Sequence, residues 1–233
     1  MADTVLVIAA HPDDEILGCG GAMAGHIDDG DSVHTAIMAE GITSRDDKRD
    51  RSKRQNELAR LHEAVHKANA ILGVTDITLF DFPDNRMDGL ERLDVIKVVE
   101  SLIEKVNPDI IYTHHRGDVN VDHGVVHDAV VTACRPLPGH KYPHTLLFFE
   151  VPSSTEWQPP DTSAPFVPGW FTDISSALDR KLKALSEYGS EMCPWPHPRS
   201  LRAVEHLARW RGATIGVDAA EAFMLGRRLN FRP

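Results

Sequence analysis

The chain has 233 residues, a formal net charge of −10 and 42% hydrophobic residues, which is ordinary for a globular domain. The acidic balance argues against a nucleic-acid-binding surface, because contacts to phosphates need clustered Lys and Arg. No apolar run approaches the ~20 residues that span a bilayer, and the first residues lack the features of a signal peptide, so we expect a cytoplasmic protein without a membrane span.

The first part of the chain alternates between predicted strands and helices. Residues 4–10 form a short apolar, β-branched run that predicts a buried parallel strand, and a glycine-rich helix is expected over about 15–26. A second strand is predicted over 32–39. Apolar residues at helical spacing predict a helix over 51–72, with Gly73 placed as its C-cap.

The same alternation continues through the middle of the chain. Strands are predicted over 76–80, 109–113 and 145–151, and helices over 90–106 and about 124–134. Strands that alternate with helices indicate an α/β fold with a mostly parallel sheet and helices on both faces.

The C-terminal part has a different pattern. Residues 152–172 are rich in Pro, Ser and Trp and predict a long ordered loop, whose length suggests a functional wall or lid. Helices are then predicted near 174–188, 200–211 and 218–228. We expect a single domain over 1–233, with a core of about 1–150 and with 151–233 completing the site.

Ligand-type side chains follow two of the predicted strands. The first strand leads into His11–Glu15 (HPDDE), and the fourth leads into the His-rich segment 114–123. In an open α/β sheet, ligands bind beyond the carboxyl ends of the strands. If the two strands are neighbours, the loops converge and offer His nitrogens and carboxylates to a metal. A spare carboxylate beside that metal could accept a proton from water.

Each loop taken alone has a simpler structural explanation. Asp-rich loops at strand ends usually cap helices, and Asp13 or Asp14 would do so well. Two such loops on one edge of the sheet favour a metal site, because His is a costly choice where Asn or Ser would cap. Zinc is the expected ion, since magnesium prefers oxygen ligands. The three cysteines lack C-x-x-C spacing and predict neither disulfides nor a cysteine zinc site.

The segment AHPDDE after an N-terminal strand, together with a later His-containing loop, resembles the PIG-L/LmbE-like zinc N-deacetylases. These include the deacetylases of mycothiol and bacillithiol synthesis, of GlcNAc-phosphatidylinositol and of chitobiose. The resemblance covers most of the chain and extends to the glycine-rich stretch Gly18–Gly21. It implies a Rossmann-like core and one zinc ion per chain, bound by His11, Asp14 and His123, with Asp13 as the general base.

The second loop departs from the pattern of many family members, which have His-Pro-Asp-His there. In those members the first His steadies the oxyanion of the tetrahedral intermediate, and the aligned residue here is Asn120. An Asn side chain can donate a hydrogen bond to an oxyanion but cannot deliver a proton. Either Asp13 performs both proton transfers, or His197 in the segment PHPRS takes part.

The second motif has the form Asp-x-Asn-x-Asp-His and resembles a subgroup of that family. The subgroup is associated with bacterial surface-sugar and amino-sugar gene neighbourhoods. Segments 84–88 (DNRMD), 152–157 (PSSTEW) and 196–200 (PHPRS) match it as well.

Four further residues are candidates for supporting roles. Asp122 precedes the predicted ligand His123 and could fix a histidine ring by a hydrogen bond, or it could cap the following helix. Asp118 could orient Asn120 or bind substrate. Arg45 and Arg86 follow the second and third strands and could hold a phosphate or a sugar hydroxyl, although a surface ion pair would also explain each of them.

These residues predict hydrolysis of an N-acetyl group, with N-acetylglucosamine or another amino sugar or sugar conjugate as the small-molecule partner. A zinc amidase acting on a thiol conjugate or another small amide would share the same metal site. A non-catalytic sugar-binding protein on the same scaffold is the alternative from another class. Homo-oligomers are common in the resembling family, and segment 152–172 could complete the site of a neighbouring copy.

Overall fold

A computed structural model describes residues 2–138, 142–160 and 164–230. Its centre is one seven-stranded sheet with the strand order β3-β2-β1-β4-β5-β7-β6. The first five strands are parallel, and β7 runs antiparallel to both of its neighbours. The strands are β1 (Thr4–Ala9), β2 (Ser32–Ala39), β3 (Asp76–Phe82), β4 (Ile110–His114), β5 (Thr145–Phe149), β6 (Trp170–Asp173) and β7 (Ala220–Arg228).

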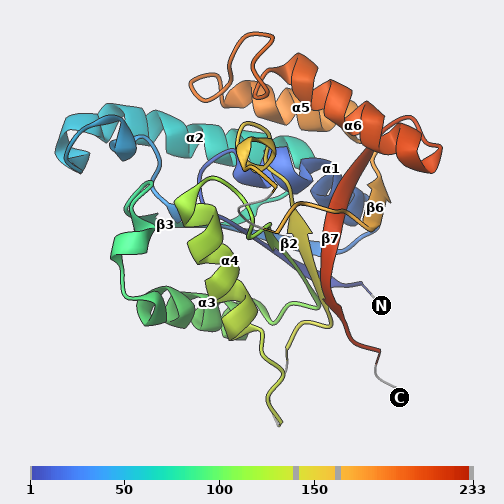
Figure 1. Ribbon diagram of the computed structural model, residues 1–233, viewed down its shortest axis with the longest axis horizontal. Coiled ribbons are helices and arrows are strands. Elements are labelled where there is room, and N and C mark those ends of the chain that lie inside the picture. Colours follow the sequence, from blue (N-terminus) through green and yellow to red (C-terminus); the bar gives the residue numbers. More distant parts are fainter. Residues whose placement is uncertain (1, 139–141, 161–163, 231–233) are drawn as a thin grey trace.

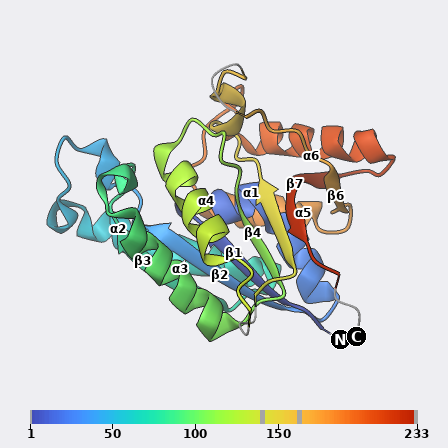
Figure 2. The same cartoon turned by 60° about the horizontal axis from the view of Figure 1, so that its bottom comes forward.

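Helices cover both faces of this sheet, as Figures 1 and 2 show. One core lies beneath α1, α2, α5 and α6, and a second core lies beneath α3 and α4 on the opposite face. The predicted α/β architecture is therefore confirmed. The α-helices are α1 (Asp14–Asp28), α2 (Gln55–Leu72), α3 (Arg92–Val106), α4 (Val121–Ala133), α5 (Leu178–Glu187) and α6 (Leu201–Ile215).

The sequence predicts the bounds of the central elements closely. Strand β2 has the predicted ends, and α2 ends at Gly73, whose φ of +91° is the left-handed C-cap conformation. The start of α2 differs, because residues 51–54 form a separate 3-10 turn. Helix α4 begins three residues earlier than predicted, since Asn120 serves as its N-cap.

The predicted helix near 218–228 is wrong, because these residues form strand β7. The run Ala219–Leu225 contains strong helix formers, and the tertiary structure overrides that local preference. Strand β7 pairs with the edge of β5 and with β6, so it satisfies the backbone of both. The predicted loop over 152–172 also contains the start of β6 and a 3-10 turn, Thr155–Trp157, while its residues 161–163 lie outside the described residues.

Helix α1 is broken at Cys19, whose φ and ψ of −147° and 21° are not helical. The carboxylate of Glu221 on β7 accepts hydrogen bonds from the N–H groups of Gly21 and Ala22, at 2.8 and 2.7 Å. Lys181 donates to the carbonyl of Leu17 at 2.8 Å and forms a buried ion pair with Glu221. These contacts satisfy backbone groups that the break would otherwise leave unpaired.

The glycine-rich stretch lets α1 lie close against its neighbours. A Cβ added at Gly18 would lie 2.3 Å from the ring of Phe149, and one at Gly21 would lie 2.7 Å from Ile174. Both positions therefore require glycine for close packing. Among the residues that the structure describes, no helix is both long and apolar enough to cross a bilayer.

Strands β1 and β4 are neighbours, with Ile8 paired to Thr113. This is the point at which the strand order reverses, since β2 and β3 lie on one side of β1 and β4 and β5 lie on the other. Open α/β sheets bind ligands at such a point, beyond the carboxyl ends of the strands. The two predicted ligand loops follow β1 and β4 and therefore meet here.

Candidate metal centre

The turn between β1 and α1 holds Asp13 in an unusual backbone conformation. Its φ is +106°, which a non-glycine residue adopts only where the surroundings impose it. Its carbonyl accepts the first hydrogen bonds of α1, from the N–H groups of Ile16 and Leu17. Its side chain makes no capping hydrogen bond. Asp13 is therefore the N-cap residue of α1 through its backbone alone, and its carboxylate is left for another role.

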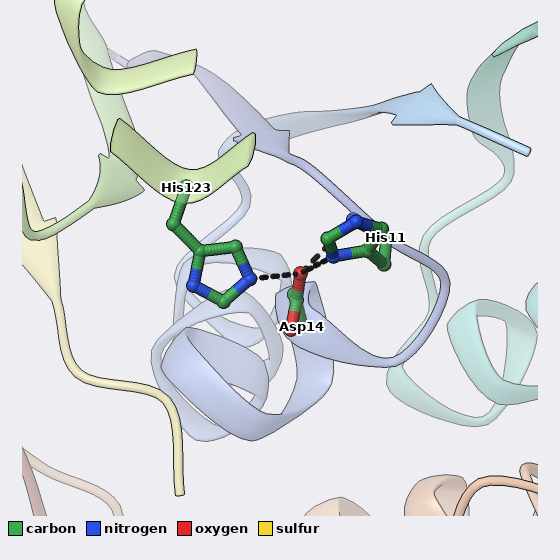
Figure 3. Close-up of side chains that lie close together, drawn as sticks. All are labelled: His11, Asp14 and His123. Atoms are coloured by element: carbon green, nitrogen blue, oxygen red, sulfur yellow. Dashed lines mark hydrogen bonds and ion pairs between the residues drawn. The ribbon is translucent and has the colours of Figure 1, made fainter. Parts of the chain in front are cut away.

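Asp14 lies at the centre of a buried cluster with His11 and His123. One carboxylate oxygen, Oδ2, lies 3.2 Å from Nδ1 of His11 and 3.1 Å from Nε2 of His123. Figure 3 shows the two rings turned toward this oxygen. One potential ligand atom from each of the three residues lies within 4.8 Å of the other two. The structure thus brings together the three side chains that the sequence predicts as metal ligands.

The start of α4 delivers His123 to this cluster. Asn120 caps the helix, because its Oδ1 accepts a hydrogen bond from the N–H of Asp122 at 2.9 Å. His123 therefore lies in the first turn, at the edge of the sheet where β1 also ends. The alternative prediction that Asp122 caps α4 is wrong.

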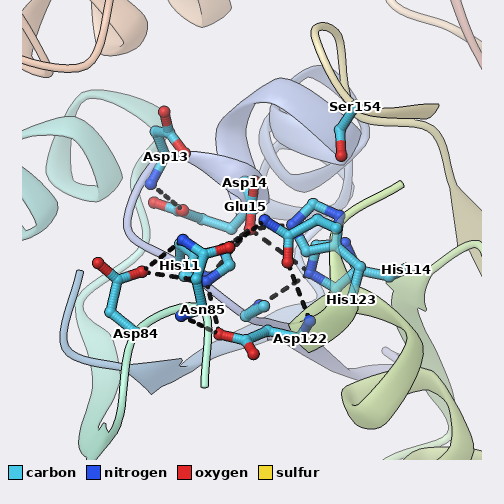
Figure 4. Close-up of polar contacts among 12 residues, drawn as sticks. His11, Asp13, Asp14, Glu15, Asp84, Asn85, His114, Asp122, His123 and Ser154 are labelled. Atoms are coloured by element: carbon cyan, nitrogen blue, oxygen red, sulfur yellow. Dashed lines mark hydrogen bonds and ion pairs between the residues drawn. The ribbon is translucent and has the colours of Figure 1, made fainter. Parts of the chain in front are cut away.

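Each predicted histidine ligand also contacts a second carboxylate through its other ring nitrogen. Nδ1 of His123 lies 3.1 Å from Asp118, and Nε2 of His11 lies 3.0 Å from Asp122. Asp122 also accepts a hydrogen bond of 2.6 Å from the N–H of Asn85 (Figure 4) and one of 2.9 Å from the N–H of Met87. Histidines that bind metals usually donate to a carboxylate in this way, which fixes the ring orientation. The histidine ring that Asp122 contacts is thus that of His11, in the loop after β1.

The chemistry of these residues fits a zinc ion. Oδ1 of Asp14 is buried and accepts no hydrogen bond from the described residues. Burial alone would raise the pKa of Asp14, but the charge of His123 and the hydrogen bond from His11 bring it well below its usual range. Burial would lower the pKa of His123, yet Asp14 and Asp118 raise it to about 9. Two imidazoles and one carboxylate form a typical zinc set, whereas magnesium would favour more oxygen atoms.

His114 supports the cluster as a packing partner. Its ring stacks on that of His123 with 3.9 Å between centroids, and its Nε2 accepts a hydrogen bond from the N–H of Ala10 at 2.8 Å. Burial lowers its pKa well below the usual value. Its Nε2 already accepts a backbone hydrogen bond and is therefore not free to bind a metal, and His114 is not among the described residues whose ligand atoms lie close enough together to share an ion.

Asp13 directly precedes Asp14 in the chain, lines a pocket together with His11, and is 1% exposed. Burial raises its pKa well above the usual range, although the positive charge of Arg199 acts in the opposite direction. Nη1 of Arg199 lies 3.2 Å from Oδ2 of Asp13. A buried carboxylate in this position, next to the predicted ligands, has the character of a proton acceptor.

A polar pocket with a volume of about 100 Å³ opens beside Asp13. Arg45 lies at this pocket and forms two hydrogen bonds of 2.9 Å to the carboxylate of Glu191. The pocket is lined by His11, Pro12, Asp13, Gly41, Ile42, Ser44, Arg45, Leu61, Asp84, Asn85, Asn120, Glu191 and Arg199. It therefore contains hydrogen-bonding groups of the kind that a sugar requires, together with Asn120 and Arg45 from the predicted site.

Asp14, Asp122 and His123 of the cluster do not line this pocket, and neither do three of the predicted catalytic and substrate-binding residues. Asp118 has a side chain that is 1% exposed and accepts hydrogen bonds from Ser154 and Thr155, so its position suits orientation of His123 rather than contact with substrate. Arg86 donates to the backbone carbonyls of residues 46 and 47, at 3.2 and 3.0 Å, and thereby holds the loop after β2. His197 has its Nδ1 occupied by the N–H of Arg199 at 3.1 Å.

Two pocket residues, Glu191 and Arg199, are absent from the sequence-based set. Both belong to the segment between α5 and α6. The sequence points to His197 in PHPRS, whereas the structure places Arg199 of the same segment beside Asp13. The segment PHPRS therefore indicates a part of the site from sequence alone. Which of its side chains reaches the pocket depends on how α5 and α6 pack over α1 and α2.

A known protein family matches the part of the chain that carries the cluster. The family model for PIG-L, described as GlcNAc-PI de-N-acetylase, matches residues 6–134. That range includes most of β1, all of β4 and both loops of the cluster.

Three related proteins have between 27% and 33% of their aligned residues identical to this chain. The uncharacterized deacetylase YaiS of Escherichia coli K12 is 33% identical over 153 residues, which is 62% of this chain and 77% of the relative. A probable N-acetyl-α-D-glucosaminyl L-malate deacetylase 2 of Bacillus cereus is 27% identical, over 80% of this chain and 83% of that protein. The 4-oxalmesaconate hydratase of Pseudomonas putida KT2440 is 28% identical, over 83% and 76%.

The fold is also that of solved structures. The N,N′-diacetylchitobiose deacetylase from Pyrococcus horikoshii aligns with a TM-score of 0.76 at 20% identity, over 96% of this chain and 84% of that chain. At this level of identity the match concerns the fold alone.

Proposed function

The chain belongs to the PIG-L family of GlcNAc-PI de-N-acetylases, and we propose that it uses one zinc ion to remove the N-acetyl group from an amino sugar or sugar conjugate. The observation that carries this proposal is the buried cluster of His11, Asp14 and His123, next to the buried carboxylate of Asp13, which accepts no hydrogen bond from the described residues. Family membership supports an N-deacetylase, and the metal and the substrate are part of the proposal.

The roles of the residues follow from their chemistry. His11, Asp14 and His123 would hold the zinc ion, which when bound polarises an acyl oxygen and lowers the pKa of water. Asp13 accepts the proton of the water that attacks the acyl carbon. As the C–N bond breaks, Asp13 returns that proton to the departing amine, and acetate and the free amine are released. Asp13 carries both proton transfers, because the amide of Asn120 is not acidic enough to deliver a proton and His197 does not line the pocket.

The proposed substrate class rests on the relatives and on the pocket. One relative is a probable deacetylase of an N-acetylglucosaminyl malate, and a structural neighbour is a deacetylase of diacetylchitobiose. Side chains of Ser44, Asp84 and Asn85 line the pocket and can exchange hydrogen bonds with sugar hydroxyls.

The test combines zinc analysis with acetate release. The purified protein should contain one zinc per chain and release acetate from at least one of N-acetylglucosamine, N,N′-diacetylchitobiose and N-acetylglucosaminyl malate. The Asp13→Ala variant should keep its zinc and lose turnover. Zinc binding without acetate release from any acetylated sugar would overturn the proposal, and cleavage of a thiol-conjugate amide instead would identify the amidase alternative. Binding of these sugars without any hydrolysis would identify a sugar-binding protein.

A second candidate reaction is addition of water to an activated double bond. The observation that favours it is the similarity to the Pseudomonas putida hydratase, which extends over 83% of this chain. A base beside a metal can deliver water to carbon in either reaction. Loss of the ultraviolet absorbance of 4-oxalmesaconate on incubation with the protein, without acetate release from the sugar panel, would favour hydration over deacetylation.

A further inference from the structure

The contacts of Asp13 leave its carboxylate dependent on one other side chain. The residue is 1% exposed, and neither of its oxygens has a hydrogen-bond partner among the described residues. Its backbone is held in the turn by hydrogen bonds from α1, but these do not reach the carboxylate. The ion pair with Nη1 of Arg199, at 3.2 Å, is the contact that opposes the cost of burying this charge.

Arg199 is fixed on its own side by the loop that carries it. Its backbone N–H donates to Nδ1 of His197 at 3.1 Å, and its carbonyl accepts from the N–H of Cys193 at 3.3 Å. The next residue, Ser200, caps α6 through its hydroxyl, which accepts from the N–H of Ala203 at 3.1 Å. The arginine side chain therefore starts from a rigid turn, which limits the entropy lost when it pairs with Asp13.

Two other polar residues of the pocket, Asn120 and Arg45, do not neutralise the charge of Asp13. Asn120 carries no charge, and its amide is already bonded to the N–H of Asp122 and to Asn85. Arg45 is 44% exposed and pairs with Glu191. Nη1 of Arg199 forms its ion pair with Asp13, while its Nε is buried and has no hydrogen-bond partner in the described part of the chain.

We propose that Arg199 is a positioning residue that holds the Asp13 carboxylate against the metal cluster in the geometry needed to accept a proton. The inference rests on the proposed function, because it takes Asp13 as the base. It assigns to the loop between α5 and α6 a part in the reaction at the other end of the chain. A misplacement of the base by about 1 Å lowers turnover by about 100-fold, which sets the size of the expected effect.

The kinetic test compares Arg199→Gln and Arg199→Lys, with N-acetylglucosamine and N,N′-diacetylchitobiose as probes. We expect Arg199→Gln to lower kcat about 100-fold with little change in KM, and Arg199→Lys to recover part of the loss. Added guanidinium ion should partly restore Arg199→Ala. Arg45→Gln removes the other arginine of the pocket and should mainly raise KM. Arg209→Gln, at an exposed ion pair on α6, should leave both constants unchanged.

A second measurement does not depend on activity. The Tm is compared for Arg199→Gln, Asp13→Asn and the double variant, each with its zinc content determined. If the two side chains act as a pair, the change in Tm of the double variant is smaller than the sum of the single changes. Additive changes, together with a kcat of Arg199→Gln near that of the wild type, would overturn the inference.

The two proposals fail in different ways. If the wild type releases no acetate from any acetylated sugar, the proposed function is wrong, and non-additive Tm changes still establish the pairing. If the wild type is active and Asp13→Ala is inactive while Arg199→Gln keeps wild-type kcat, only the role of Arg199 is wrong.

Discussion

Asp118 lies 3.1 Å from Nδ1 of His123 and is buried on the side of the ring that faces away from Asp14. The same carboxylate accepts hydrogen bonds from the hydroxyl groups of Ser154 and Thr155 and from the N–H of Asn120. It thus links the loop after β5 to the orientation of a predicted metal ligand. The two residues are five positions apart in the sequence, yet their relationship depends on the turn that precedes α4.

The first prediction concerns this carboxylate. Asp118→Asn keeps the shape of the side chain and removes the charge that orients His123, so zinc affinity should fall about 10- to 100-fold. Competition with a chromophoric chelator measures that affinity. Asp128→Asn on α4, whose carboxylate pairs with Arg116 on the surface, is the matched control and should bind zinc like the wild type. Equal affinities for Asp118→Asn and the wild type would contradict the assigned role.

The second prediction concerns removal of the metal. A ligand at 100 times its Kd stabilises the native state by about 2.7 kcal/mol, so chelation should lower the Tm by roughly 5–10 °C for a chain of this size. Differential scanning calorimetry with and without chelator measures the change. His123→Ala should abolish the difference, whereas His66→Ala, at an exposed position on α2, should preserve it. A chelator effect that survives in His123→Ala would place the ion elsewhere.

The third prediction concerns the ion pair that supports the broken helix α1. Lys181→Met leaves the carboxylate of Glu221 buried without its cation and should lower the free energy of unfolding by about 3–5 kcal/mol. Removing both charges, in Lys181→Met with Glu221→Gln, should cost less than the single change. Urea unfolding measures each value. Lys183→Met, at an exposed position on the same helix, is the control, and a loss as large there would show that α5 tolerates no change.

The fourth prediction concerns Glu40, which is 1% exposed and lies at the end of β2. Burial alone would raise its pKa, but hydrogen bonds from Arg49 and Thr43 and the charge of Arg51 lower it below 4.5. Because the folded pKa is depressed, this stabilisation is present above pH 4.5 and is lost as the pH falls through the folded pKa.

Glu40→Gln should therefore be less stable than the wild type at pH 7 by about 2 kcal/mol, and the difference should shrink in acid. Urea unfolding at pH 7 and at successively lower pH measures it. Glu63→Gln removes an exposed carboxylate paired with Lys67 and should have little effect at pH 7. A difference for Glu40→Gln that does not change with pH would mean that its charge contributes nothing to stability.

Much of the fold can be predicted from local sequence patterns. The buried strands are short apolar runs, and the central helices show regular apolar spacing that ends at Gly73 or at residues 107–108. Strand β7 could not be predicted in this way. Its residues favour a helix locally, and only the free edge of β5 and the partner strand β6 make it a strand.

The segment His11–Glu15, between β1 and α1, also has some features that the sequence predicts and others that only the structure shows. The sequence places His11, Asp13 and Asp14 beyond the first strand, and the structure keeps them at the cluster. Glu15 points away from it and accepts hydrogen bonds from Asn69 and Tyr188. Residues in consecutive positions thus have separate roles, because the break from strand to helix turns each side chain in a different direction.

The sequence by itself determined the fold class and the residues at the two strand ends, because alternating patterns and ligand-type residues are local features. Only the tertiary structure decided that Asp122 orients His11, that Asp118 orients His123 and that Arg199 pairs with Asp13. Asp13 and Arg199 are 186 positions apart, so no local pattern relates them. Their contact exists because the segment between α5 and α6 is packed over the end of β1, and a buried carboxylate without that cation would be costly to keep charged.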